Sequence, residues 1–194
     1  MYKACWVLIC VVFLILSAST LAQNAPDVRV LFAQLNQTKT TDRAAQGVLD
    51  IAGKDSNARE YVVQRLSQMI DKTEIDKVWL NAVRLAGHLK ASETVPSLQR
   101  AFSRGQLGRP AGTTLGAEMQ LHDDVVAKAL AEIGEPSLPA VKAFLKSSDR
   151  KDRRRAVLIL LNMDAPESRK VLEEHLPHET DPKITRLIES GLRS

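Results

Sequence analysis

The sequence predicts an all-α protein, and three observations carry that prediction. Apolar residues recur at helical spacing almost without interruption from Asp27 onward. No segment shows the sustained alternation of apolar and polar residues that a half-buried strand requires. Aromatic residues make up only 4% of the chain, and Ala, Leu, Val, Arg, Lys and Glu are abundant, which favours helices over strands.

Each helix is assigned from the spacing of its apolar residues and from the residues at its ends. The first carries Val28, Leu31 and Phe32 on one stripe, and the second has Thr41 as a suitable N-cap and Gly53 as a suitable stop. On this basis we predict helices over 27–37, 41–52, 57–70, 74–89, 94–103, 118–133, 137–146, 151–163, 167–176 and 182–192.

Residues 1–22 have the features of a cleavable secretory signal peptide. Lys3 precedes an apolar core over 5–16, and a stretch of small and polar residues follows. Thr20 and Ala22 would occupy the −3 and −1 positions, so we expect cleavage before Gln23. This predicts a periplasmic or secreted protein.

The alternative for this segment is an uncleaved membrane anchor, because residues 4–22 could nearly span a bilayer. The short apolar core and its polar end favour cleavage, after which we expect no stable membrane insertion. Both cysteines, Cys5 and Cys10, lie in the segment. The mature chain, 23–194, would therefore have no disulfide and would depend on its core for stability.

The net charge is too small to identify a partner. The chain has 27 basic and 23 acidic side chains, and removal of Lys3 leaves 26 against 23. A surplus of this size does not predict a polyanion by itself, so only clustering of charge can support one. An exported chain with few aromatic residues is also not expected to bind nucleic acid.

The second half of the chain repeats itself with a period of about 30 residues. The pairs that share this separation are Leu130 with Leu160, Ile133 with Met163, and Val141 with Val171. The preceding repeat lies further away, since the spacing from Ala86 to Leu130 is 44. The additional length matches that of the Gly-rich stretch 103–116, so a repeat with one insertion explains both spacings.

The repeat resembles the HEAT-repeat family, in its short variety of about 30 residues. The first helix of such a repeat often starts with a proline-containing turn, as at 95–98 and 138–141. The second helix often reads Arg-x-x-Ala-x-x-x-Leu-x-x-Ile, and here the matching residues are Arg153, Ala156, Leu160 and Met163. The resemblance covers 75–176 and is weak at both ends of the chain.

This resemblance implies an α-solenoid, a HEAT-like superhelix of about five stacked helical pairs, over 23–194. First helices are expected on the outside and second helices on the concave face. Small residues such as Ala82, Ala86 and Ala129 would let helices approach closely. The resemblance also implies that Arg153 ties adjacent repeats together. It specifies an architecture, and it implies no particular chemistry.

The strongest candidate site is a cluster of basic residues at the start of a second helix. It consists of Arg150, Lys151, Arg153, Arg154 and Arg155. Guanidinium groups in such density suit bidentate capture of carboxylate or phosphate. Cations at a helix N-terminus also oppose the helix dipole. The competing interpretation is a solvated face combined with the structural role of the arginine.

The insertion 103–116 is the second candidate, because loops of this length are often functional. It contains Arg104 and Arg109 and is either a partner-contacting loop or a tolerated flexible insertion. The glycines at 108 and 112 do not form a phosphate loop, because no Gly-Lys-Ser/Thr sequence and no preceding strand accompany them.

No catalytic or metal-binding constellation is evident in the sequence. His175 and His178 lie near several glutamates, but Pro177 interrupts the helix and no third ligand has a diagnostic spacing. We expect surface histidines and no cofactor. Asp123 and Asp124 are expected to face solvent, and Trp79 is expected to lie within the helical stack.

Three functional hypotheses remain. The leading one is an exported, non-catalytic scaffold that binds a protein partner on its concave face. The second is binding of a polyanion, such as a phosphorylated glycan or a lipid headgroup, through the Arg150–Arg155 cluster with Arg104 and Arg109. The third is an enzyme built on a repeat scaffold, for which no nucleophile motif is present.

Overall fold

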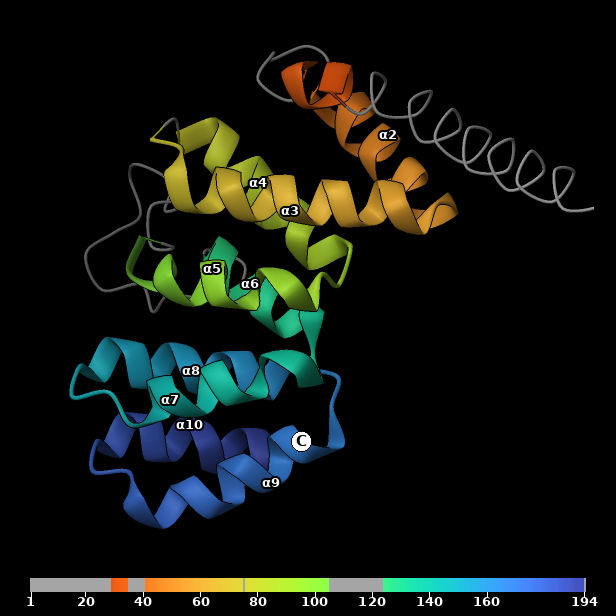
Figure 1. Cartoon of the computed structure of the whole chain (residues 1–194). Helices are drawn as coiled ribbons and strands as arrows, with labels where there is room; N and C mark the ends of the chain where they lie inside the picture. The colour runs from red at the N-terminus through yellow and green to blue at the C-terminus, as the bar shows by residue number, and fades with distance from the viewer. Residues whose placement is uncertain (1–28, 35–40, 75, 105–123, 194) are drawn as a thin grey trace, which may run out of the picture. The chain divides into compact units, whose positions relative to one another are not determined.

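The computed structural model describes residues 29–34, 41–74, 76–104 and 124–193, which are drawn in colour in Figure 1. The predicted signal peptide, Arg109 and most of the predicted insertion lie outside these residues. Every regular element within them is helical, so the all-α prediction is confirmed there. No helix in the described part of the chain is long and apolar enough to span a membrane.

The helices follow one another with short connections, close to the predicted ranges. Residues 29–34 are also helical. The α-helices with printed bounds are α2 (Thr41–Lys54), α3 (Ser56–Lys72), α4 (Asp76–His88), α5 (Val95–Arg100), α6 (Val125–Ile133), α7 (Leu138–Leu145), α8 (Arg150–Asn162), α9 (Pro166–His175) and α10 (Pro182–Arg193). Short 3₁₀ helices over Ser92–Thr94 and Glu135–Ser137 precede α5 and α7, and a third, Leu176–His178, follows α9.

Several predicted helix ends differ from those of the structure, and two of them have a clear physical reason. Gly53 was expected to stop α2, but the helix continues to Lys54, and nothing lies within 4 Å of the position that a Cβ of Gly53 would take. The helix predicted to start at residue 118 begins only at Val125, because Asp124 has an extended backbone and caps it. The carboxylate of Asp124 accepts a hydrogen bond from the amide of Ala127 at 3.0 Å, which satisfies a free N–H of the first turn.

The chain divides into two compact units, Met1–Val62 and Val63–Ser194. In the first unit α2 contributes a buried stripe of Ala44, Val48 and Ala52, and Phe32 is also buried. Gly47 permits close packing there, since a Cβ at its position would lie 3.0 Å from the side chain of Leu31.

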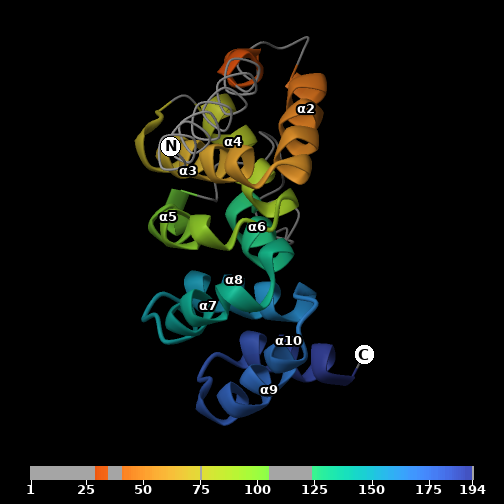
Figure 2. The ribbon, with the colours of Figure 1, turned by 45° about the vertical axis from the view of Figure 1, so that its right-hand side comes forward.

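The second unit is a two-layer stack of helical pairs. The even-numbered helices α4, α6, α8 and α10 pack in succession, and the odd-numbered helices α5, α7 and α9 do so in a second layer. Figures 1 and 2 show the two layers, with α5 packed on α6, α7 on α8, and α9 on α10. We call the even-numbered set the second helices and the odd-numbered set the first helices. This arrangement is repeat-like, as the period of the sequence predicts.

The core of this unit lies between the two layers. The largest fully buried apolar side chains include Leu98, Leu130, Ile159, Leu160 and Leu172. Trp79 is fully buried too, so its predicted place in the stack is confirmed.

Each first helix begins with the same hydroxyl contact. Thr94 and Ser137 donate to the carbonyls of Ala91 and Gly134, three positions earlier, at 2.7 and 2.8 Å. Ser168 makes the equivalent contact at 2.7 Å, which fixes the turn entering α9. Ser137 and Ser168 are 31 residues apart, one more than the predicted period of about 30. The hydroxyl of α9 therefore comes one position later in its repeat than the hydroxyl before α7.

Close approach between second helices depends on glycine as well as alanine. A Cβ placed on Gly87 of α4 would lie 2.9 Å from Cα of Ala129 and 2.5 Å from a carboxylate oxygen of Glu132, both on α6. Ala82, Ala86 and Ala129 are all buried, and Ala129 lies at this contact.

Candidate functional site

The predicted basic cluster divides into buried and exposed members. Arg155 lies in the interior with a fully buried side chain. Its Nε donates to the carboxylate of Asp124, and its Nη2 donates to the carbonyl of Phe102 at 2.6 Å. Its Nη1 lies 3.6 Å from a carboxylate oxygen of Asp152. Arg155 therefore joins α8 to the N-cap of α6 and to the residues that follow α5.

An aromatic pair completes the surroundings of Arg155. Its guanidinium carbon lies 3.5 Å from the centroid of the Phe102 ring, a cation–π contact. The rings of Phe102 and Phe144 stack with centroids 3.7 Å apart and planes 6° apart. The expectation that Asp124 faces solvent is wrong, because its side chain is buried as the counter-ion of Arg155.

Arg153 ties two neighbouring repeats together, as the family resemblance implied. Its Nε and Nη2 donate to Glu179 at 3.1 Å, and its Nη1 donates to the carbonyls of Ser147 and Ser148. Glu179 has no exposed side-chain surface and also lies 3.2 Å from Nε2 of His175. Burial would raise the pKa of Glu179, but the hydrogen bonds from Arg153 and from the backbone amide of Asp181 hold the pKa below its usual value.

The remaining members of the cluster lie nearer the surface. Arg150 pairs with Asp181 and remains about half exposed. Lys151 is exposed, and its backbone amide donates to the N-cap Asp149 at 2.8 Å. Arg154 is partly buried and has polar contacts of its own. The cluster is thus mostly engaged with carboxylates of this chain, a use that the sequence did not distinguish from ligand binding.

Arg104, predicted to belong to the insertion, is anchored in the fold. It lies in the helical turn that follows α5, so the irregular stretch does not begin at residue 103. Its Nη1 donates to the carbonyl of Thr73 at 2.7 Å, and its guanidinium carbon lies 4.7 Å from the ring centroid of Trp79.

The described histidines, His88, His175 and His178, do not gather into a metal site. Within the described residues, no group of three or more His, Cys, Asp or Glu side chains is placed to hold a metal ion. His175 is mostly buried beside Glu179 rather than on the surface, while His178 is exposed as expected.

A depression lies across the second helices α4, α6 and α8. A cavity of about 100 Å³ between α4 and α6 includes Arg84, His88, Lys128 and Glu132 in its lining. A second, of about 420 Å³, shares three of these residues and extends to α8. We call the two together the second-helix groove. Its complete lining is Arg84, Gly87, His88, Lys90, Val125, Lys128, Ala129, Ala131, Glu132, Asn162 and Asp164.

The groove is built from equivalent positions of successive repeats. Polar residues of the groove follow the two spacings of the repeat. His88 and Glu132 are 44 residues apart, across the insertion, and Glu132 and Asn162 are 30 residues apart, from α6 to α8. They form a polar row across α4, α6 and α8. Nδ1 of His88 lies 3.4 Å from a carboxylate oxygen of Glu132, and Nζ of Lys128 lies 3.7 Å from the other oxygen. The centre of the groove therefore carries a small charge network.

Lys90 occupies an unusual backbone position at the end of α4. Its φ is +48°, the only positive φ at a non-glycine residue in the described part of the chain. Its amide donates to the carbonyl of Gly87 at 2.8 Å, and the amide of Ala91 donates to that of Ala86 at 3.0 Å. This is the pattern of a Schellman turn, whose left-handed residue is usually glycine. Gly134, with φ +80°, occupies the equivalent position after α6.

The groove is not evident in the sequence, because its residues are far apart along the chain and individually ordinary. Extending the two repeat spacings to polar positions would have found the row, since repeats align equivalent positions in space.

No protein-family model matches the chain, and no curated protein matches it significantly. Among solved structures it is similar to the crystal structure of an engineered protein, with 18% identity over 85% of this chain and 77% of that one, at a TM-score of 0.40. The chain is an all-α, repeat-like protein.

Proposed function

We propose that the mature chain, residues 23–194, is an exported, non-catalytic scaffold of HEAT-like repeats that binds a protein partner in the second-helix groove. The observation that supports this most is the polar row of His88, Glu132 and Asn162, one residue from each of three successive repeats. A surface of this kind suits an extended partner, because it presents similar positions at regular intervals.

The ion pairs that the clustered arginines already form favour a protein partner over a polyanion. Arg150, Arg153 and Arg155 each pair with a carboxylate of the same chain. A phosphate would have to displace those carboxylates, and the ones that hold Arg153 and Arg155 are buried. In the second-helix groove Arg84 is exposed and forms no ion pair within the described residues, and the pairs that His88 and Lys128 make with Glu132 are partly exposed.

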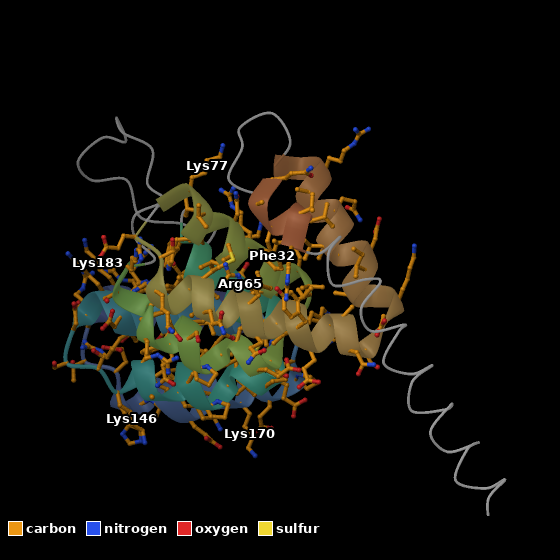
Figure 3. The ribbon with its side chains drawn as sticks, turned by 45° about the horizontal axis from the view of Figure 1, so that its top comes forward. Phe32, Arg65, Lys77, Lys146, Lys170 and Lys183 are labelled. Atoms are coloured by element: carbon orange, nitrogen blue, oxygen red, sulfur yellow. The ribbon has the colours of Figure 1, made fainter. Side chains whose placement is uncertain are left out.

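The proposal is tested by affinity capture from the native cell envelope with purified 23–194. One variant bait removes the groove side chains His88, Lys128 and Asn162 by substitution with Ala. A matched control replaces Lys142 and Lys146 of the first-helix layer, both exposed, and Figure 3 shows Lys146 projecting from the ribbon. We expect a partner that the wild type and the control retain and that the groove variant loses.

A third bait, with Lys151 and Arg154 changed to Ser, separates the polyanion alternative. It leaves the buried pairs of Arg153 and Arg155 intact, and because Arg154 is partly buried with contacts of its own, the helical content of this bait is checked by circular dichroism. If only this third bait loses the captured molecule, or if the groove and control variants lose it equally, the groove is not the binding site.

A further inference from the structure

The charges of the second-helix groove are arranged in two rows. The inner row is the polar row already described, in which Nδ1 of His88 and Nζ of Lys128 lie 3.4 and 3.7 Å from the two carboxylate oxygens of Glu132. The outer row begins with Arg84 on α4 and continues with Lys128 on α6, the equivalent position of the following repeat. The next equivalent position, Leu158 on α8, is buried, so the outer row consists of two cations.

These cations are available to a partner. Arg84 is exposed and forms no ion pair within the described residues. Lys128 is half exposed, and its contact with Glu132 is an exposed i,i+4 pair, a class that contributes little to stability. Lys90 adds a third exposed cation at the end of α4.

The acidic groups of the groove do not cancel this charge. Glu132 is the one carboxylate that lines the smaller cavity, against the two cations Arg84 and Lys128, and Asp164, after α8, lines the larger cavity. Asp164 does not line the smaller cavity, which contains Arg84 and Lys128. The part of the groove between α4 and α6 therefore has a positive excess, although the mature chain as a whole is only slightly basic.

We propose that the partner bound in this groove presents an extended acidic segment, whose carboxylates pair with Arg84 and Lys128; this rests on the proposed scaffold function. Packed helices lie about 8–10 Å apart. Three residues of extended chain cover about 10 Å. A segment crossing α4 and α6 with two acidic residues three positions apart therefore matches the outer row, and Lys90 strengthens its attraction.

The test uses synthetic fluorescein-labelled peptides and full-length mature protein, 23–194, in a fluorescence anisotropy titration at low ionic strength. One peptide carries two glutamates three positions apart in a Gly/Ser background. The second places the same two glutamates side by side, and the third has glutamines instead. We expect the spaced glutamate peptide to bind most tightly, the glutamine peptide to bind least, and binding to weaken as salt is added.

Charge variants locate the peptide on the protein. Arg84→Glu and Lys128→Glu are each expected to weaken binding of the spaced peptide by at least about fivefold, and their combination by more. Asp164→Asn removes a repulsive charge and is expected to leave affinity equal or to raise it. The control Lys142→Glu/Lys146→Glu changes the net charge as much as Arg84→Glu/Lys128→Glu does and is expected to change affinity by less than about twofold.

Several results would overturn the inference. These are equal binding of the glutamate and glutamine peptides, equal weakening by the groove and control variants, or displacement of the peptide by inorganic phosphate as effectively as by free glutamate. Absence of binding would overturn it as well. The capture experiment is independent of peptide charge, so a partner that still requires the groove would preserve the scaffold function while excluding an acidic segment.

Discussion

At the scale of single residues, the basic cluster has two kinds of arginine with opposite consequences. Arg155 is a buried cation whose counter-ion, Asp124, is buried too. Breaking a buried pair by removing one member leaves an uncompensated charge and costs about 3–5 kcal/mol. We therefore expect Arg155→Ala to lower the free energy of unfolding by about that amount in urea denaturation.

Lys151→Ala is the matched control for this substitution, since Lys151 belongs to the same helix and is exposed. It is expected to change stability by less than about 0.5 kcal/mol. The double variant Arg155→Met/Asp124→Asn removes both charges and keeps a capping side chain, so it should recover part of the loss. Equal stability of Arg155→Ala and Lys151→Ala would show that the buried pair does not contribute to the free energy of unfolding.

Glu179 predicts a dependence of stability on pH. Its pKa is lowered in the folded protein, so its stabilising contribution is present above its unfolded pKa and is lost as the pH falls through the folded value. We expect the difference in unfolding free energy between the wild type and Glu179→Gln to be constant near neutrality. Below about pH 4.3, the ordinary pKa of glutamate, the difference should shrink.

This prediction is checked by denaturant titrations of both proteins at a series of acidic pH values. Arg153→Gln should reduce the same pH dependence, because Arg153 donates hydrogen bonds to the Glu179 carboxylate. A gap between wild type and Glu179→Gln that widens on acidification would contradict the assignment.

A substitution at Lys90 should change stability and peptide binding in opposite directions. Glycine adopts a positive φ without the steric cost that lysine incurs there. Lys90→Gly should therefore raise the free energy of unfolding by up to about 1 kcal/mol and, at the same time, weaken binding of the acidic peptide. A destabilised variant would contradict the stability half of this prediction. An unchanged peptide affinity would contradict the binding half.

At the scale of helices, the spacing of second helices depends on Gly87. An alanine there would place its Cβ 2.9 Å from the backbone of Ala129, which cannot move without shifting α6. We expect Gly87→Ala to destabilise the protein by about 1–3 kcal/mol, as overpacking does. Gly53→Ala is the matched control, because its Cβ would meet nothing within 4 Å and alanine favours helix. It should stabilise α2, and an equal loss in both variants would contradict the packing argument.

The sequence predicted the helices well and their ends less well, for identifiable reasons. Apolar periodicity located α2 to α10, since each buries one stripe against a neighbour. It placed the start of α6 too early, because the pattern of apolar residues continues past the capping contact of Asp124. Gly53 was assigned as a stop from its residue type, although its open surroundings permit a helix there.

At the scale of the whole molecule, the repeat explains both what the sequence revealed about the site and what it concealed. Local clustering drew attention to residues 150–155, but Glu179, Asp124 and Phe102, which hold Arg153 and Arg155, lie in other repeats and are 26 to 53 residues away. Charge pairing over such separations cannot be inferred from the cluster alone. The residues of the second-helix groove are the converse case: they are distant in sequence, and only the stacking of α4, α6 and α8 brings them together.

The claim that a partner occupies the second-helix groove is tested most directly by site-specific photo-crosslinking in cells that produce the protein. A photoreactive residue is placed singly at Lys128 or Asn162, and, as controls on the first helices, at Lys142 or Lys170, which is exposed and labelled in Figure 3. We predict one adduct of the same mass from both groove positions and none from the controls. Adducts from the first-helix positions alone, or from all four alike, would contradict the proposed binding site.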